Sequence, residues 1–405
     1  MTIVVQKFGG TSVATLDRIA AVGERVRAEI EAGNRVIVVV SAMAGATNQL
    51  VAWVRDITPF YDPAEYDAIM ASGEMVTSGL LALTLQSMGI PARSWHAWQL
   101  PIEAEGPYTK GHISSVHLEH LLPDVLSGRV AVVAGFQAIS QDKRWMTLGR
   151  GGSDTSAVTL AAAIGASRCD IYTDMDGIYS ADPRIVTQAR KLPVVTFGEI
   201  LELASLGAKI LHVHSVVIAC IHNIKLRVLT SFGNVPGTLV TSEEEVVPEG
   251  LVRGIALITD EERIHLSGDF SPIEVLAFLS KQAFGVDMIT FTPLETSLGT
   301  SAGAGVTLSF LIPTLERERI QDALKTFMRD HGPFEVTTEA SLAKISLVGT
   351  GLRSNLEALS TILNTVKTCG AELRGMVATE LRVSVLVPRD YGEQVVRALH
   401  TQFCE

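Results

Sequence analysis

A glycine-rich stretch at Leu148–Ala157 constrains the fold of this chain more than any other feature of its sequence. The stretch follows an apolar run, Val130–Ala134, whose composition is typical of a buried strand. It leads into an alanine-rich run, Ala157–Ile164, which has high helix propensity and stops at Gly165. This order predicts a strand, a glycine turn and a helix in succession.

The start of that helix is a candidate anion site. Glycines precede it and allow a tight turn, and Ser153 or Asp154 is the expected N-cap residue. The free backbone N–H groups and the dipole of a helix N-terminus attract an anion. Arg150 adds a positive charge and Asp154 a negative charge. The alternative at this point is a turn that only connects a strand to a helix.

The order of strand, glycine-bearing loop and helix recurs near the start of the chain. A β-branched strand at Ile3–Gln6 runs into the loop Lys7–Val13, and an amphipathic helix is expected over Leu16–Ala32. A second strand, Arg35–Val40, runs into the polar loop Ser41–Asn48. Repeated units of this kind predict an α/β domain with a mainly parallel sheet between helices. Ligands of such domains bind at the carboxyl ends of the strands.

Two further segments fit the same domain. Ser72–Glu74 precedes an apolar helix that continues to Leu85. The strand Ile171–Thr173 opens into a long loop, Asp174–Arg184, in which Pro183 excludes continuous regular structure. Binding residues often lie in such loops, because a rigid scaffold positions them.

The α/β pattern stops near Gly237, and the acidic segment Glu243–Glu245 has the polarity of a linker. Beyond it lies a weak internal repeat of about 80 residues, in which Ile264–Gly268 is echoed by Ile345–Gly349. Each copy continues with a helix, a glycine-led strand, a strand that ends in proline and an amphipathic helix. The order βαββα, found twice, predicts two α+β ferredoxin-like units. We therefore expect a catalytic domain at 1–240, a linker at 241–262 and two small domains at 263–335 and 336–405.

Composition narrows the class of protein. The chain has 405 residues, of which 47% are apolar and 19% charged, as expected for a globular protein of two or three domains. The net charge of −11 argues against non-specific binding of nucleic acids. The first residues lack the pattern of a secretory signal, and no apolar run is expected to reach the ~20 residues that span a membrane. We expect a cytoplasmic protein that binds neither nucleic acids nor membranes.

The glycine loops match neither the Walker pattern nor the dinucleotide-binding pattern. Lys7 instead stands at the end of the first strand, just before Gly9 and Gly10 in the sequence, and Arg150 and Lys209 add two more cations. Phosphoryl transfer depends mostly on positioning and on stabilisation of negative charge, which lysines and backbone N–H groups supply. The alternative for Lys7 is a solvated lysine at a strand end.

Three of these segments resemble the signature motifs of the aspartokinases, a family within the amino-acid kinase superfamily. They are Lys7–Val13, Gly149–Asp154 and Thr173–Arg184. The resemblance extends to the C-terminus, because the tandem small domains resemble the paired ACT domains of the family. It implies an amino-acid kinase domain followed by two ACT domains. It also implies transfer of the γ-phosphate of ATP to the β-carboxylate of L-aspartate, the first step toward the aspartate-family amino acids, with Mg²⁺ as cofactor.

The resemblance implies roles for individual residues. The residues implied in catalysis are Lys7, Asp154 and Lys209, with Asp154 holding a lysine in place. The residues implied for the nucleotide are Lys7, Gly9, Gly10, Thr173, Asp174, Tyr179, Arg184 and Lys209. The residues implied for aspartate are Ser41, Thr47, Glu74, Arg150 and Ser153. No residue is assigned as a metal ligand, since Mg²⁺ is expected on phosphate oxygens and water.

Charge arguments agree with these implied roles. A carboxylate with an ordinary pKa of ~3.9 is ionised at neutral pH, so its phosphorylation needs no general base. Repulsion between that carboxylate and the triphosphate is the obstacle, and cations must offset it. Arg150 could bind the α-carboxylate of aspartate with two parallel hydrogen bonds, and Glu74 could accept from its ammonium group.

The sequence departs from the family at regulatory and hinge positions. Val213 and His214 replace a Pro-Arg pair, and the ACT loops Ser271–Ile273 and Ser354–Leu356 lack the usual glycine. Met288–Pro293 lacks the asparagine that commonly grips the effector amino acid. We therefore expect only weak inhibition by lysine or threonine alone. We also expect a homodimer that forms through the ACT-like units.

Two other functions remain open from sequence. One is an acid kinase of the same superfamily that acts on glutamate or acetylglutamate; Glu74 argues against an acetylated substrate, which has no ammonium group. The other is a non-catalytic protein that senses amino acids. The cations Lys7 and Arg150 argue against a sensor, which has no need to bind a transferring phosphoryl group.

Overall fold

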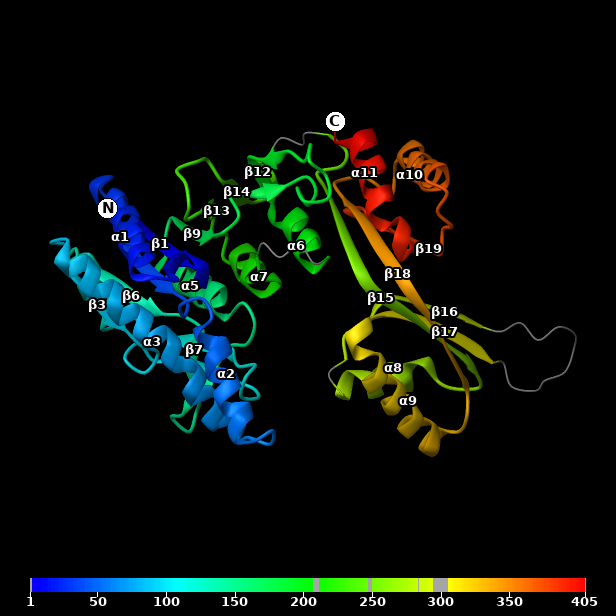
Figure 1. The fold of residues 1–405 in the computed structure, drawn as a ribbon, viewed down its shortest axis with the longest axis horizontal. Coiled ribbons are helices and arrows are strands. Elements are labelled where there is room, and N and C mark those ends of the chain that lie inside the picture. Colours follow the sequence, from blue (N-terminus) through cyan, green and yellow to red (C-terminus); the bar gives the residue numbers. More distant parts are fainter. Residues whose placement is uncertain (1, 207–210, 247–249, 283, 294–304, 405) are drawn as a thin grey trace, which may run out of the picture. The chain divides into compact units, whose positions relative to one another are not determined.

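The computed structural model describes residues 2–206, 211–246, 250–282, 284–293 and 305–404. The chain forms two compact units (Figure 1). The N-terminal unit comprises Met1–Tyr179 and Arg190–Pro248, and the C-terminal unit comprises Ser180–Ala189 and Glu249–Glu405. Each unit is described by itself.

The N-terminal unit is built on an eight-stranded sheet in which every neighbouring pair except β13 and β14 is parallel. In spatial order the strands are β12 (Val194–Thr196), β14 (Thr238–Thr241), β13 (Leu226–Thr230), β9 (Arg168–Thr173), β1 (Ile3–Phe8), β2 (Arg35–Val40), β6 (Val130–Ala134) and β3 (Ala92–Trp95). The predicted parallel α/β domain is therefore confirmed.

Helices cover both faces of this sheet. On one face α1 (Leu16–Glu31) and α3 (Pro63–Ser87) pack on each other and on alternate side chains of β2 and β6 (Figure 1). On the other face α5 (Gly152–Ile164) packs against β1, β2 and β9, and α7 (Val213–Ile221) packs against α5. Strands covered on both faces are mostly apolar, which explains the continuous valine runs of β2 and β6. The remaining helices of this unit include α2 (Ala46–Ile57), α4 (Leu121–Leu126) and α6 (Phe197–Ser205).

Helix α3 corrects one expectation. By length and composition it could cross a membrane, so the expectation that no run is long and apolar enough is wrong. The helix has no charged residue between Met75 and its end at Ser87. It packs against α1, β3 and β6, while Val76 and Leu83 are exposed. It also carries two buried carboxyl groups, those of Asp67 and Glu74. These contacts make α3 a core helix of the N-terminal unit.

A small second sheet combines two strands that precede β6 in the chain with two that lie between β6 and the glycine-rich stretch. Its strands, in spatial order, are β5 (His112–Val116), β4 (Ile102–Glu105), β7 (Gln137–Ile139) and β8 (Trp145–Thr147). Asp67 of α3 holds β8, since it accepts from the Thr147 hydroxyl at 2.7 Å and the Thr147 N–H at 2.9 Å. The direct step from strand to glycine turn that the sequence predicts therefore contains two additional strands.

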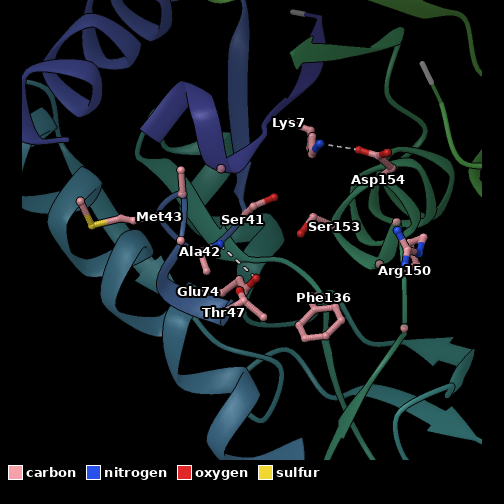
Figure 2. Close-up of a pocket in the computed structure, with 16 residues that line it drawn as sticks. Lys7, Ser41, Ala42, Met43, Thr47, Glu74, Phe136, Arg150, Ser153 and Asp154 are labelled. Atoms are coloured by element: carbon pink, nitrogen blue, oxygen red, sulfur yellow. Dashed lines mark hydrogen bonds and ion pairs between the residues drawn. The ribbon is translucent and has the colours of Figure 1, made fainter. Parts of the chain in front are cut away.

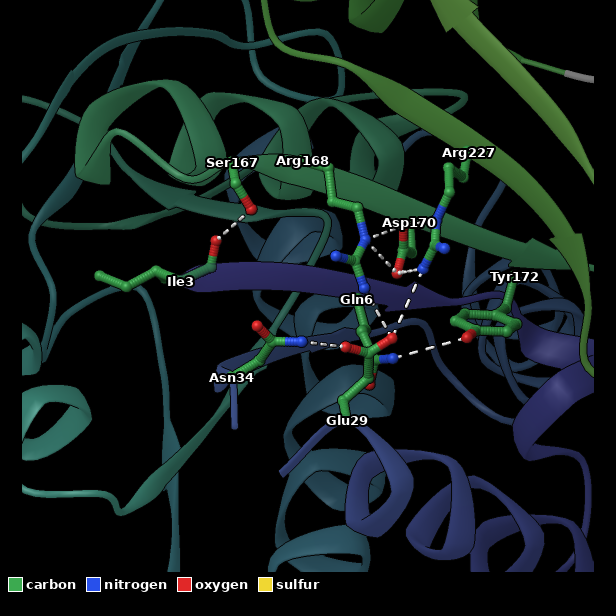
Figure 3. Close-up of polar contacts among 9 residues, drawn as sticks. All are labelled: Ile3, Gln6, Glu29, Asn34, Ser167, Arg168, Asp170, Tyr172 and Arg227. Carbon is green, nitrogen blue, oxygen red and sulfur yellow. Dashed lines mark hydrogen bonds and ion pairs between the residues drawn. The ribbon is translucent and has the colours of Figure 1, made fainter. Parts of the chain in front are cut away.

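A buried charge cluster joins the middle of the large sheet to α1 (Figure 3). Asp170 of β9 is 0% exposed and accepts from Arg168 Nε at 3.1 Å and from Arg227 Nη2 at 2.6 Å. Glu29 of α1 accepts from Arg168 Nη2 at 2.6 Å. Two carboxylates and two guanidinium groups therefore balance one another.

The C-terminal unit contains a six-stranded antiparallel sheet in the order β16-β17-β15-β18-β20-β19. Its first half is β15 (Gly254–Gly268), α8 (Pro272–Lys281), β16 (Asp287–Pro293), β17 (Val306–Pro313) and α9 (Arg317–His331). Its second half is β18 (Glu335–Val348), α10 (Leu356–Thr368), β19 (Gly375–Ala378), β20 (Arg382–Pro388) and α11 (Gly392–Phe403). The two predicted βαββα repeats are present, and β15 pairs with β18 at the centre of the sheet.

The expected linker at 241–262 is partly strand. β15 begins at Gly254, because Ile255 pairs with Leu347 of β18 and its side chain is buried. The two altered effector loops begin helices. The Ser271 hydroxyl accepts from the N–H of Glu274 at 3.4 Å and Asn355 Oδ1 accepts from the N–H of Ala358 at 2.9 Å. Ser271 and Asn355 are therefore the N-caps of α8 and α10.

Candidate active site

A cavity of about 330 Å³ opens at the carboxyl ends of β1 and β2 (Figure 2). Its lining residues are Lys7, Gly10, Ser41–Gly45, Thr47, Glu74, Phe136 and Gly149–Asp154. The cavity thus brings together every residue that the sequence implied for aspartate, as well as Lys7, Gly10 and Asp154. This is the edge of a parallel sheet where ligands are expected to bind.

Two helices begin at this cavity after a glycine in the left-handed region. Gly45 has φ +85° before α2, and Gly151 has φ +73° before α5. Gly151 is the N-cap of α5, so the expectation of Ser153 or Asp154 is wrong. A Cβ on Gly151 would lie 2.3 Å from Cγ of His212, which leaves room only for glycine. Ser153 and Asp154 therefore fall in the first turn, where their side chains line the cavity.

Lys7 and Asp154 form an ion pair with Nζ 2.6 Å from Oδ1. Lys7 lies on β1 and is 9% exposed, so its ammonium group has a fixed place at the cavity wall. A Cβ on Gly9 would lie 3.5 Å from Lys7 Nζ, and the N–H of Gly9 donates to the carbonyl of Tyr172 at 3.2 Å. The expected contact between Asp154 and a lysine is present.

Glu74 presents a buried carboxyl group to the cavity. Its Oε1 accepts from the N–H of Ala42 at 3.0 Å, and its Oε2 has no hydrogen-bond partner among the described residues. Burial raises the pKa of Glu74 from 4.5 to about 7, although the N–H of Ala42 opposes the shift. A buried oxygen without a partner is costly, so a ligand that donates to it would relieve that cost.

Arg150 presents the opposite charge to the same cavity. Its guanidinium group is exposed and makes no hydrogen bond or ion pair with the residues that the structure describes. Ser41, Thr47 and Ser153 add hydroxyl groups to the lining. One unpaired cation, one unpaired carboxyl oxygen and neutral donors suit a ligand that carries both an anionic and a cationic group.

Phe136 is a lining residue that the sequence reasoning missed. It has φ +67°, a conformation that costs a bulky residue about 1–3 kcal/mol. Hydrogen bonds hold it there, because its N–H donates to the Ser156 hydroxyl and its carbonyl accepts from Leu148, both at 3.0 Å. Its ring lies at the cavity between Glu74 and Arg150 (Figure 2). Its position just after β6 was the available signal, since the carboxyl ends of parallel strands carry ligand-binding residues.

The residues implied for the nucleotide lie outside the cavity lining, except Lys7 and Gly10. Thr173 is the last residue of β9, which neighbours β1 in the sheet, and Asp174 follows it; the Thr173 hydroxyl donates to Asp174 at 2.9 Å. The Tyr179 hydroxyl donates to Asp176 at 2.8 Å. Lys209 lies outside the described residues.

Arg184, the last of these residues, belongs to the C-terminal unit. Its guanidinium group pairs with Asp182 at 2.7 Å. Within the described ranges no group of three His, Cys, Asp or Glu side chains could hold a metal ion.

Comparison with known proteins agrees with this geometry. Residues 2–230 match the model of the amino acid kinase family, and residues 345–403 match an ACT domain model. An aspartate kinase of Pseudomonas putida is 40% identical over 408 residues, which cover 100% of this chain and 98% of that protein. Aspartokinase 2 of Bacillus subtilis is 36% identical over 408 residues, with coverage of 100% and 98%.

Solved structures give the same result. The crystal structure of E. coli aspartokinase III in complex with aspartate and ADP has a TM-score of 0.82 at 27% identity, with 100% of both chains covered. The same enzyme with lysine and aspartate has a TM-score of 0.76. Fold, cavity and family models together define an amino acid kinase with a C-terminal ACT region. Within that class, the chain belongs to the aspartokinase family.

Proposed function

We propose that this chain is an aspartate kinase, which transfers the γ-phosphoryl group of ATP to the β-carboxylate of L-aspartate. Membership of the aspartokinase family supports this activity. The observation that carries the proposal is the cavity itself, where the unpaired Oε2 of Glu74 and the unpaired Arg150 guanidinium group face one ligand-sized space.

Aspartate would supply partners for both Arg150 and Glu74. Its α-carboxylate would accept two parallel hydrogen bonds from Arg150, and its ammonium group would donate to Glu74. The hydroxyl groups of the lining, from Ser41, Thr47 and Ser153, would donate to the remaining carboxylate oxygens. An acetylated amino group could not donate as an ammonium group does, which favours a free amino acid over an acetylated one.

The phosphoryl group would lie near Lys7, which Asp154 orients. The positive ends of the α2 and α5 dipoles and the ammonium group of Lys7 would offset the repulsion between the two anionic reactants. Thr173, Asp174, Tyr179, Arg184 and Lys209 are proposed to bind ATP, with Gly9 and Gly10 giving the phosphates close access to the backbone. Mg²⁺, bound mainly through phosphate oxygens, would neutralise charge on the nucleotide. We also propose a homodimer that forms through the ACT-like units.

Trapping of the product with hydroxylamine tests this proposal. An acyl phosphate reacts with hydroxylamine to give a hydroxamate, which forms a coloured complex with ferric iron, so purified protein with MgATP should give this colour with L-aspartate. Formation with L-glutamate or N-acetyl-L-glutamate in preference to L-aspartate would identify one of the alternative acid kinases. No hydroxamate with any of the three would favour a protein that senses amino acids without turnover.

A further inference from the structure

We propose that His400 is a positioning residue for nucleotide binding, which acts through the segment Ser180–Ala189. The inference rests on the proposed function, because it takes the motif Thr173–Arg184 as the nucleotide-binding loop. The sequence of that motif is continuous, yet the structure divides it between the two units: Tyr179 is the last residue in the N-terminal unit before Ser180 enters the C-terminal unit.

The segment Ser180–Ala189 is part of the hydrophobic core of the C-terminal unit. Ala181 and Val186 are 4% and 5% exposed and belong to a buried cluster that also contains Ile255 of β15 and Leu399 of α11. A segment that contributes two side chains to a core cannot move independently of that core, because interiors are close-packed. The course of the motif after Tyr179 is therefore fixed by residues more than two hundred positions later in the chain.

A buried polar contact reinforces this anchor. Ser180 Oγ and His400 Nε2 are 2.8 Å apart, and His400 is 0% exposed. The carbonyl of Ser180 accepts from the N–H of Ile255 at 2.7 Å, so a backbone hydrogen bond also joins Ser180 to the start of β15. Three residues before His400 on the same helix, Arg397 donates to the carbonyl of Ile185 at 3.4 Å. One face of α11 therefore holds the start and the middle of the segment.

These anchors bear on the nucleotide residues at either side of Ser180. Tyr179 directly precedes it and pairs with Lys191, where β10 (Ile178–Tyr179) and β11 (Lys191–Leu192) close the base of the segment. Arg184 lies between the two buried anchors and has an 89% exposed side chain. Its backbone is thus held on both sides, while its guanidinium group stays accessible to a ligand. Loss of the His400 contact would loosen the backbone that carries Arg184 and follows Tyr179.

The test uses the full chain with His400→Phe, which removes the polar contact and keeps a ring of similar size. We expect KM for ATP to rise about fivefold, which corresponds to one neutral hydrogen bond, with KM for aspartate unchanged. His400→Gln, whose amide nitrogen reaches a position close to that of Nε2, should restore most of the ATP affinity. Ser180→Ala should match His400→Phe, and the double variant should be no worse than either single variant.

Ser346→Ala is the matched control. It also removes a buried side-chain contact in the C-terminal unit, the 2.7 Å bond to Ser384, but does so on β18 and β20. If Ser346→Ala raises KM for ATP as much as Ser180→Ala, or if His400→Phe raises both KM values equally, the positioning role is overturned. Failure of the wild-type chain to phosphorylate aspartate would instead overturn the proposed function.

Discussion

Two groups of charged residues in the N-terminal unit differ in how completely the protein satisfies them. Around Asp170, in the middle of the sheet, two carboxylates and two guanidinium groups bind one another (Figure 3). At the carboxyl edge of the same sheet, Glu74 keeps an oxygen without a partner and Arg150 makes no pair among the described residues. The first group has no capacity left for a ligand, whereas the second group has that capacity and a cavity beside it.

The difference separates stability from function. Removal of one member of a buried ion pair lowers the stability of the protein, because the partner charge stays buried without compensation. A charge that the fold leaves unpaired lowers stability and is retained where a ligand completes it. Substitutions in the two groups should therefore give opposite patterns of stability and activity.

The largest expected effect is on stability, from Asp170→Ala. Removal of this carboxylate leaves Arg168 and Arg227 without their buried partner, so the free energy of unfolding should fall by about 3–5 kcal/mol. Urea denaturation measures the change. Glu24→Ala, which removes an exposed pair with Arg27, is the control and should change stability by less than about 0.5 kcal/mol. An equal, small effect of both variants would show that the buried cluster carries no special weight.

Lys7→Ala should reverse that pattern. Loss of a positioned cation beside the phosphoryl group should lower kcat about 10²-fold or more. The free energy of unfolding should fall less than in Asp170→Ala, because Asp154 lines a cavity that water can enter. Steady-state kinetics and denaturation on the same preparation measure both. Turnover close to that of the wild type would make Lys7 a structural partner of Asp154 only.

Arg150→Lys keeps the positive charge and removes the planar guanidinium group. Lysine cannot make two parallel hydrogen bonds to a carboxylate, so KM for aspartate should rise about tenfold while KM for ATP changes less. Initial rates at varied concentrations of each substrate measure the two values. Equal losses for both substrates would place Arg150 on the phosphate side of the site.

Glu74 should make aspartate binding depend on pH. Burial raises its pKa to about 7, so below that pH the free protein holds Glu74 neutral and binds an ammonium group poorly. KM for aspartate should rise about fivefold from pH 7 to pH 6, following the loss of the ionised form. Glu74→Gln should bind aspartate more weakly than the wild type, and its KM for aspartate should not change with pH over this range.

The raised pKa of Glu74 also makes the stability of the protein depend on pH. The folded protein holds this proton more tightly than the unfolded chain, because the pKa is raised from 4.5 to about 7. The contribution of Glu74 to stability is therefore highest below pH 4.5 and falls as pH rises toward 7. The Glu74→Gln variant should lose that part of the pH dependence in urea denaturation. A pH dependence of stability unchanged by this substitution would contradict the shift.

Much of the fold follows from local patterns in the sequence. The valine runs of β2 and β6 are apolar because both faces of these strands are covered by helices. The repeat after Gly237 corresponds to the two βαββα halves of the C-terminal unit, which share one sheet. The glycine motifs predicted the loops that line the cavity. Lys7, Glu74 and Arg150 lie at that cavity, as the resemblance to the aspartokinases implied.

The features that sequence reasoning missed depend on contacts between distant residues. Gly151 became the N-cap of α5 because the His212 ring, some sixty positions away, leaves no room for a Cβ. Phe136 adopts positive φ because Ser156 and Leu148 hold its backbone. The passage of Ser180–Ala189 into the C-terminal core depends on α11 at the far end of the chain. No local pattern records these contacts.

Stabilisation by the free ligand tests most directly whether aspartate completes the unpaired charges, since it requires no chemical step. A ligand at a hundred times its Kd raises the free energy of unfolding by about 2.7 kcal/mol. Urea denaturation of the wild-type chain should show such a rise with saturating L-aspartate, and at the same concentration the rise should be smaller in Glu74→Gln and Arg150→Lys. No rise in the wild type, or an equal rise in all three proteins, would contradict the account.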